Sequence, residues 1–257
     1  MFSPDEVAEN AVKAGVKKAE LPWWKMVMLG VMAGAFIALA GVGATLGAYY
    51  GGKIVGALIF PVGLFMVVVA GSELFTGNNL MAMALLDGKI GFAGLMKNWG
   101  LVFIGNLIGA VIVAIMAVVS GVLDVASEAV MATAASKVSL GFGEAMIRGV
   151  LCNFLVCIAV WMGFAAKTVT QKFVAVFMPV MLFVLCGFEH SVANMYYVPA
   201  GMVMSSLSGF GGVSVGEFLL GNLLPVTIGN IIGGAIMVGG NVLSNISMAE
   251  KISRKAY

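Results

Sequence analysis

The chain has 257 residues, of which 61% are hydrophobic and only 10% charged, and its mean hydropathy is +1.07. Because about a quarter of the residues in a soluble domain are charged, this composition excludes a soluble enzyme and indicates an integral membrane protein. The net charge of +2 says little, and no nucleic-acid partner is expected. The three cysteines lie in apolar segments without CxxC or Cys/His spacing, so no metal or other cofactor is expected.

The N-terminal segment is predicted to form an amphipathic helix. Residues 4–21 place apolar side chains among Glu6, Glu9 and three lysines, which is typical of a helix at a membrane surface, and a solvated leader fits the same pattern. The following Pro22-Trp23-Trp24-Lys25 is an aromatic and basic belt of the kind that anchors a span at the interface. Residues 1–25 are therefore expected to form a cytoplasmic helix before the first span.

Six apolar spans follow, each long enough at about 1.5 Å per residue to cross about 30 Å of hydrocarbon. Their expected bounds are 26–49, 54–86, 98–121, 142–166, 173–204 and 216–245, with the second and fifth interrupted. An even number of crossings places both termini on one side of the membrane. Eleven Lys and Arg residues fall on that side, against Lys53, Lys137 and Arg148 on the other. Both termini are therefore predicted to be cytoplasmic, in a bacterial-type inner (cell) membrane.

The two halves of the chain, 26–121 and 142–245, resemble each other. The segments 71–78 and 187–194 share Gly, Glu and Asn at matching positions, and a proline precedes each of them. Three spans per half require the second half to be inserted upside down, which gives a 3+3 inverted repeat. Broken helices are tolerated at membrane depth where they line a cavity or lie buried in protein, so both breaks are expected at a pore or substrate site. The predicted fold is an all-α membrane protein with six transmembrane helices and broken second and fifth helices, forming a single channel domain over 1–257.

His190 is the only histidine, and it lies beside Glu189 at the second break. An ionisable residue inside a membrane is a functional-site hypothesis by default, and an imidazole titrates near neutral pH. His190 is therefore expected to donate or relay a proton at the narrowest part of a pore, and the alternative is an imidazole that only joins two helices. Glu73 and Glu189 are expected to cap backbone N–H groups freed at the breaks, with tuning of His190 as the alternative.

Small polar residues accompany the breaks. Thr76, Asn153 and Asn194 are expected to satisfy freed backbone groups, and the Thr76 hydroxyl is also a candidate contact for a permeant. Lys137, in the outer connection before the fourth span, would concentrate anions if it leans into the pore mouth. A snorkelling anchor is the alternative for Lys137.

Four motifs together closely resemble the formate/nitrite transporter family, over almost the whole chain. They are Gly-Ser-Glu-Leu-Phe-Thr-Gly at 71–77, Lys-Asn-Trp at 97–99, Leu-Cys-Asn-Phe-Leu-Val-Cys-Ile-Ala-Val-Trp-Met at 151–162, and Gly-Phe-Glu-His-Ser-Val-Ala-Asn-Met at 187–195. Phe154 stands where tryptophan is common in relatives. The resemblance implies a homopentamer in the lipid bilayer, built from six-helix protomers of aquaporin-like fold, each with its own pore for small monovalent anions.

The resemblance also suggests roles for individual residues. By this likeness the central histidine is His190, the loop threonine is Thr76 and the vestibule lysine is Lys137. Similar alignment places Phe60 and Phe183 at an outer hydrophobic slit, and Leu64 and Leu74 at an inner one. Without the family, each of these four apolar residues is simply part of the core.

The expected function is a channel for the anions of weak acids, namely formate, nitrite or hydrosulfide. Lys137 would attract the anion, and His190 would assist its protonation between the two slits. A proton-coupled secondary transporter of the same anions is a competing interpretation. An aquaporin-like neutral-solute channel is another, although neither break carries Asn-Pro-Ala. A membrane-bound enzyme or haem carrier would need a cluster of ligands or nucleophile partners that the chain does not offer.

Overall fold

The computed structural model describes residues 1–240, and these residues form helices without any strand. The last residues of the sixth predicted span, 241–245, lie outside the described part. The helices are α1 (Pro4–Glu20), α2 (Trp23–Gly51), α3 (Lys53–Ile59), α4 (Pro61–Ala70), α5 (Phe75–Asn78), α6 (Ala82–Leu86), α7 (Phe92–Val119), α8 (Ser127–Val138), α9 (Phe142–Ala165), α10 (Val169–Cys186), α11 (Ser191–Ser208) and α12 (Leu224–Ile231). Two 3₁₀ turns, η1 (Asn79–Met81) and η2 (Asp124–Ala126), and two π-helical segments, η3 (Glu217–Leu223) and η4 (Ile232–Gly240), complete the set.

Six helical stretches in the described residues are long and apolar enough to cross a membrane. They are Trp23–Gly51, Lys53–Ala70, Phe92–Val119, Phe142–Ala165, Val169–Cys186 and Glu217–Gly240. The second and the fifth are each 18 residues long and end at Ala70 and Cys186. The expected spans 54–86 and 173–204 continue past these ends, because they were drawn across the expected interruptions and apolar residues follow each of them.

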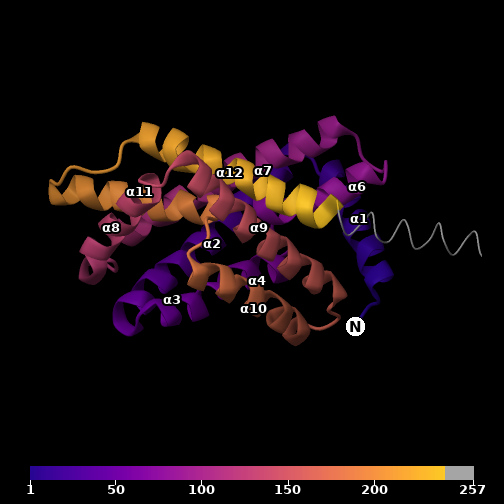
Figure 1. Ribbon diagram of the computed structural model, residues 1–257, viewed down its shortest axis with the longest axis horizontal. Coiled ribbons are helices and arrows are strands. Elements are labelled where there is room, and N and C mark those ends of the chain that lie inside the picture. The colour runs from indigo at the N-terminus through magenta and orange to yellow at the C-terminus, as the bar shows by residue number, and fades with distance from the viewer. Residues whose placement is uncertain (241–257) are drawn as a thin grey trace, which may run out of the picture.

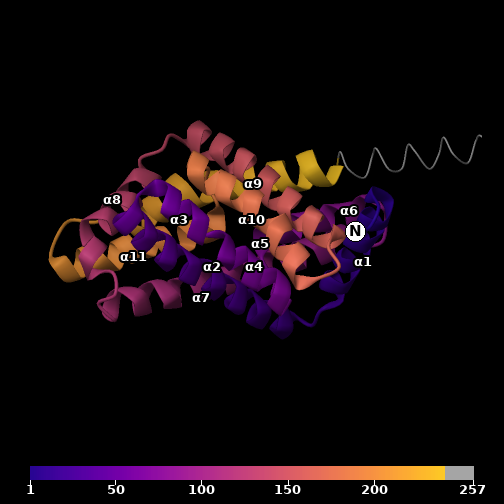
Figure 2. The same ribbon diagram turned by 90° about the horizontal axis from the view of Figure 1, so that it is seen from below.

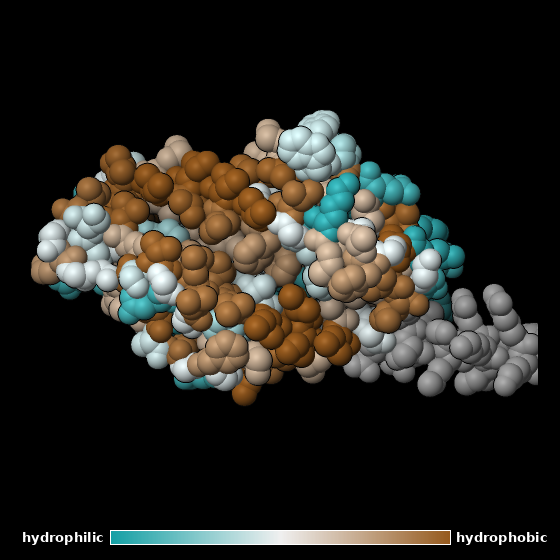
Figure 3. Space-filling model, turned by 90° about the horizontal axis from the view of Figure 1, so that it is seen from above, coloured by the Kyte–Doolittle hydropathy of each residue, from teal (hydrophilic) through white to brown (hydrophobic). Residues whose placement is uncertain are grey.

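The molecule is elongated, and its two ends carry different elements. Helices α1 and α6 lie at one end of the long axis and α8 lies at the other, in both ribbon views (Figures 1 and 2). Hydrophobic side chains cover the middle of the face in Figure 3, and hydrophilic ones gather mainly toward the end that carries α1. A broad apolar surface that gives way to polar side chains toward an end of the long axis is expected of a protein that spans a bilayer.

Helix α1 starts with a capping box, in which Ser3 and Glu6 each accept a hydrogen bond from the other's backbone N–H. Hydrogen bonds from Ser3 lower the pKa of the exposed Glu6 carboxyl. The apolar face of α1 packs on protein, with Ala8 and Ala11 in one cluster with Met83 and Ala84. The helix is thereby fixed against α6 at its end of the molecule.

Two helix pairs cross at unusually short distance, α2 with α7 and α9 with the α12–η4 segment. At Gly109 of α7, an added Cβ would overlap the backbone oxygen of Val31 on α2. At Gly229 of α12, it would overlap the backbone oxygen of Met146 on α9. Small residues at such crossings let helix backbones approach closely, which is how helices associate in lipid.

Two helices stop at a left-handed glycine inside the apolar body. Helix α4 ends before Gly71 with φ of +69°, and α10 ends before Gly187 with φ of +72°. A positive φ is open to glycine and strained for residues with a Cβ. After each glycine the backbone extends and a new helix begins, and the N-cap residues Leu74 (φ −109°, ψ 122°) and His190 (φ −110°, ψ 114°) have nearly the same conformation.

Candidate functional site

The two interrupted stretches meet at Thr76 and His190. The Thr76 Oγ1 lies 2.9 Å from the His190 Nε2, and both residues are buried. Thr76 belongs to α5, which follows the first interruption, and His190 is the N-cap of α11, which follows the second. Side chains 114 positions apart in the sequence are thus brought into direct contact.

The hydrogen bonds of His190 define its neutral tautomer. The backbone N–H of Ala193 donates to His190 Nδ1 at 3.0 Å, so this nitrogen acts as an acceptor. A neutral imidazole then carries its hydrogen on Nε2 and donates to the Thr76 hydroxyl. Thr76 is fully buried and lines none of the cavities described below, so its hydroxyl supports the imidazole ring from behind.

Three cavities lie in series around this pair. The outer cavity, of about 350 Å³, and the central one, of about 10 Å³, share Phe60, Phe183 and His190 in their walls. The central cavity shares Leu64 and Leu74 with an inner cavity of about 220 Å³. A space of about 10–15 Å³ holds one water, so the middle of this path admits little more than that.

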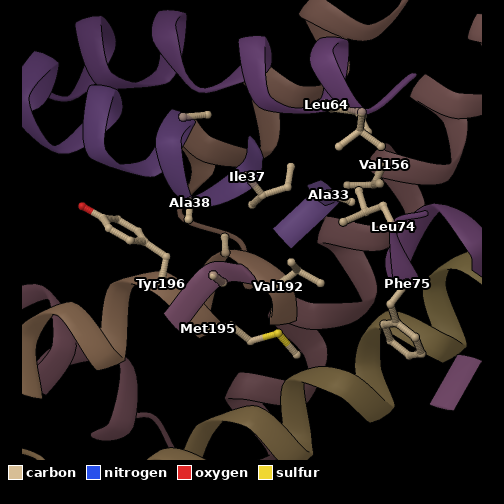
Figure 4. Close-up of a cluster of buried hydrophobic side chains, with 14 of the residues drawn as sticks. Ala33, Ile37, Ala38, Leu64, Leu74, Phe75, Val156, Val192, Met195 and Tyr196 are labelled. Carbon is tan, nitrogen blue, oxygen red and sulfur yellow. The ribbon is translucent and has the colours of Figure 1, made fainter. Parts of the chain in front are cut away.

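Apolar side chains form both walls of the central cavity. The rings of Phe60 and Phe183 meet edge to face with centroids 5.9 Å apart, and Phe183 stacks on His190 at 5.8 Å. On the other side, Leu64 and Leu74 point toward each other with Val156 close by, as Figure 4 shows. The four apolar residues suggested by the resemblance therefore lie on either side of His190.

Each interruption is fixed by one buried asparagine. The Asn106 amide donates to the backbone oxygens of Gly30 at 2.8 Å and Glu73 at 2.9 Å, and its oxygen accepts from the Phe75 N–H at 2.9 Å. Asn230 makes the same set of bonds in the other half, to Gly149 at 2.8 Å, Glu189 at 2.9 Å and the Ser191 N–H at 2.9 Å. One backbone oxygen and one backbone N–H at each break are thereby satisfied.

The two glutamates at the interruptions bind lysines. Glu73 lies 2.6 Å from the Nζ of Lys18, and Glu189 lies 2.8 Å from the Nζ of Lys137. Each carboxylate also accepts from an asparagine five residues later, Asn78 at 2.7 Å and Asn194 at 2.6 Å. The expectation that these glutamates cap backbone N–H groups therefore differs from the structure, where Asn106, Asn230 and His190 supply the acceptors.

Lys18 was not among the residues expected at the site. It lies on α1 with Lys13 and Lys17 nearby in the sequence, and no spacing marks it as different from them. Its pairing with Glu73 depends on α1 folding back on the body of the protein. Lys137, in contrast, was expected near a pore mouth, and it lines the outer cavity beside Tyr197.

Asn153 joins the two halves behind the Thr76–His190 pair. Its side-chain amide donates to the backbone oxygen of Thr76 at 3.2 Å, the side-chain oxygen of Asn79 at 2.9 Å and the backbone oxygen of Asn230 at 2.7 Å. It lies outside the three cavity walls, so the structure places it in a supporting position. Asn194 lines the outer cavity.

The helical body, the apolar middle and the cavities in series define a multi-pass membrane transport protein. Residues 5–243 match the family model described as "Formate/nitrite transporter". The chain belongs to this formate/nitrite transporter family.

Relatives of known sequence and structure agree with this assignment. The chain is 42% identical over 247 residues to the "Uncharacterized transporter YrhG" of Bacillus subtilis, covering 92% of this chain and 90% of the relative. It is 38% identical over 263 residues to "Formate channel FocA" of Escherichia coli K12, covering 93% and 92%. Among solved structures it is similar to a "Pentameric formate channel with formate bound" (TM-score 0.74, 33% identity, covering 85% and 95%). It is also similar to an "FNT family ion channel" (TM-score 0.76, 27% identity, covering 91% and 96%).

Proposed function

We propose that this protein is a homopentameric channel for formate, with one pore in each protomer. Relatives named as formate channels and a solved pentameric formate channel support formate as the substrate and five as the number of subunits. Nitrite and hydrosulfide are small monovalent anions of weak acids, and we extend the proposal to them on that shared chemistry.

The observation that carries the proposal is the row of three cavities with His190 in the wall between the outer and central ones. A path that narrows at apolar walls and carries a hydrogen-bonding pair at its middle suits a small solute that crosses without its hydration shell. An anion of one to three heavy atoms, which covers hydrosulfide, nitrite and formate, meets that size limit after modest side-chain motion.

The matching contacts at the two interruptions support a 3+3 inverted repeat with broken second and fifth helices. Asn106 and Asn230 make corresponding bonds, as do the Lys18–Glu73 and Lys137–Glu189 pairs. In such a repeat the two mouths are related by the axis that passes between the breaks. We place the end that carries α1 in the cytoplasm of a bacterial-type cell, following the distribution of Lys and Arg.

Protonation within the pore would lower the barrier to an anion. Moving an unpaired carboxylate into a low-dielectric constriction costs several kcal/mol even after relaxation. Protonating an acid of Asp-like pKa, about 3.9, costs about 4 kcal/mol at pH 7. The Lys137 ammonium has three N–H donors and gives one to Glu189, so two remain to hold the anion at the outer mouth. His190, which lines the outer and central cavities and is held by Thr76, would then assist the proton transfer.

The test is formate, nitrite and hydrosulfide uptake into liposomes by wild type and His190→Asn across a range of pH. Asparagine is a good N-cap, so this variant keeps the start of α11 and removes the titratable ring. We expect wild-type flux above that of empty liposomes to rise as pH falls, and the variant to lose most of that rise.

An unchanged pH dependence in His190→Asn would remove the proton-assisting role. Thr76→Ser retains the hydroxyl that faces Nε2 and serves as the matched control, with a pH profile like that of wild type. Formate entry that generates a membrane potential would show that the anion itself crosses, as in a channel, whereas electroneutral entry with internal acidification would show that a proton crosses with each formate.

A further inference from the structure

The two lysines of the outer cavity differ in their partners. Lys137 is paired with Glu189 at 2.8 Å, and the two side chains are 15% and 4% exposed, so the pair adds no net charge to the cavity. Lys53 also lines this cavity and is exposed. Within residues 1–240, no ion pair or hydrogen bond involves its ammonium group. The unbalanced positive charge of the outer cavity is therefore that of Lys53.

Lys53 occupies an unfavourable position for the helix that carries it. It is the first residue of α3, and the positive end of a helix macrodipole repels a cation. Its Nζ lies 3.8 Å from the place that a Cβ on Gly187 would take, so the side chain reaches across to the turn after α10. That turn follows a helix C-terminus, which attracts a cation. The ammonium thus lies over the turn that leads to Glu189 and His190.

The inner cavity repeats the arrangement. Lys18 is paired with Glu73 at 2.6 Å, and this pair also sums to zero. Lys172, in the first turn of α10, is half-buried and lines the same cavity. In the part of the chain that the structure describes, its ammonium has no ion pair. Each mouth therefore holds one compensated lysine and one uncompensated lysine.

We propose that Lys53 and Lys172 capture anions at the two mouths by long-range attraction, while the paired Lys137 and Lys18 act only on contact. This inference rests on the proposed anion-channel function. A charge pair has the field of a dipole, which falls off faster with distance than the field of a single charge. Attraction by an exposed single charge is screened by salt, with a Debye length of about 30 Å at 0.01 M and about 3 Å at 1 M. The two kinds of lysine should differ in salt dependence.

The flux test compares formate uptake at low formate concentration, for wild type and Lys53→Gln, at about 0.01 M and about 1 M ionic strength. At low salt we expect Lys53→Gln to lower uptake about threefold, as follows from removing a unit charge roughly 7 Å from the entering anion in water. At high salt the two proteins should match. Lys53→Arg keeps the charge and should behave as wild type. Lys89→Gln removes a charge that lines neither described mouth cavity and should have no effect.

A second measurement reads the local potential without transport. Cys186 is an exposed thiol one residue before Gly187, whereas Cys152 and Cys157 are buried. The ratio of its reaction rates with an anionic and a cationic thiosulfonate should fall roughly fivefold in Lys53→Gln at low salt, because removing one charge affects the two reagents in opposite directions.

Equal rate ratios in wild type and Lys53→Gln, or a loss of uptake that is the same at both ionic strengths, would overturn the proposal. A wild type without formate uptake, but with the expected change in rate ratio, would instead contradict formate as the substrate. Thermal unfolding of the purified proteins shows whether a loss of folding causes either result. Lys53→Gln should have the same melting temperature as wild type.

Discussion

Replacing Lys137 by alanine is expected to lower the free energy of unfolding by roughly 3–5 kcal/mol, because the buried Glu189 is left with an uncompensated charge. The Glu189 side chain is 4% exposed, and its remaining partners are the amides of Asn194 at 2.6 Å and Asn222 at 3.3 Å. Two amide donors do not replace an ammonium. The measurement is unfolding of the purified protein in mixed micelles by titration with a denaturing detergent.

Arg148→Ala is the matched control. Arg148 pairs with Glu144 at 2.6 Å, but the two side chains are 40% and 51% exposed. Exposed pairs of this kind contribute about 0–1 kcal/mol. The double variant Lys137→Met/Glu189→Gln removes both charges and should recover most of the loss. If Lys137→Ala and Arg148→Ala unfold alike, the Lys137–Glu189 pair does not hold the outer mouth together.

The Lys137→Ala variant also tests the role of Lys137 in anion binding. Lys137→Ala should lower anion flux more than it lowers the flux of an uncharged solute, because the removed donors face the anion. Equal losses for both solutes would leave Lys137 as an interfacial anchor.

The sequence predicted much of the frame because the relevant signals are local. Hydropathy located the spans, and a glycine with a glutamate two residues later marked where α4 and α10 end at Gly71 and Gly187. The pairing of Arg148 with Glu144 is local in the same way, because the two residues lie four positions apart on one helix. Each of these features depends on neighbours within a few residues.

The remaining features depend on contacts between distant residues. Lys18 binds Glu73 across 55 positions, and Asn106 holds a backbone turn 33 positions away. No local pattern separates Lys18 from Lys17, and a polar Asn106 in an apolar span does not by itself indicate which backbone groups it binds. The tautomer of His190 could not be predicted from the sequence either, because it is set by the Ala193 N–H once α11 has formed.

Gly109→Ala is expected to destabilise the protein by about 3 kcal/mol, at the upper end of the range for overpacked interiors. The added methyl group would overlap the backbone oxygen of Val31, and a backbone cannot move aside by changing rotamer. Helices α2 and α7 would have to separate. Asn106 lies three residues away on α7 and holds both Gly30 and Glu73, so the separation would also loosen the first interruption. Formate uptake should fall along with stability.

Gly100 provides the control on the same helix, since nothing lies within 4 Å of the Cβ that alanine would add there. Alanine is a better helix former than glycine by about 1 kcal/mol, so Gly100→Ala should unfold at the same or a slightly higher detergent fraction than wild type. The two variants differ only in whether the methyl group meets another helix. Should Gly109→Ala be as stable and as active as Gly100→Ala, the α2–α7 crossing would have to be wider than described, and Asn106 would lose its place as the residue that links this crossing to the pore.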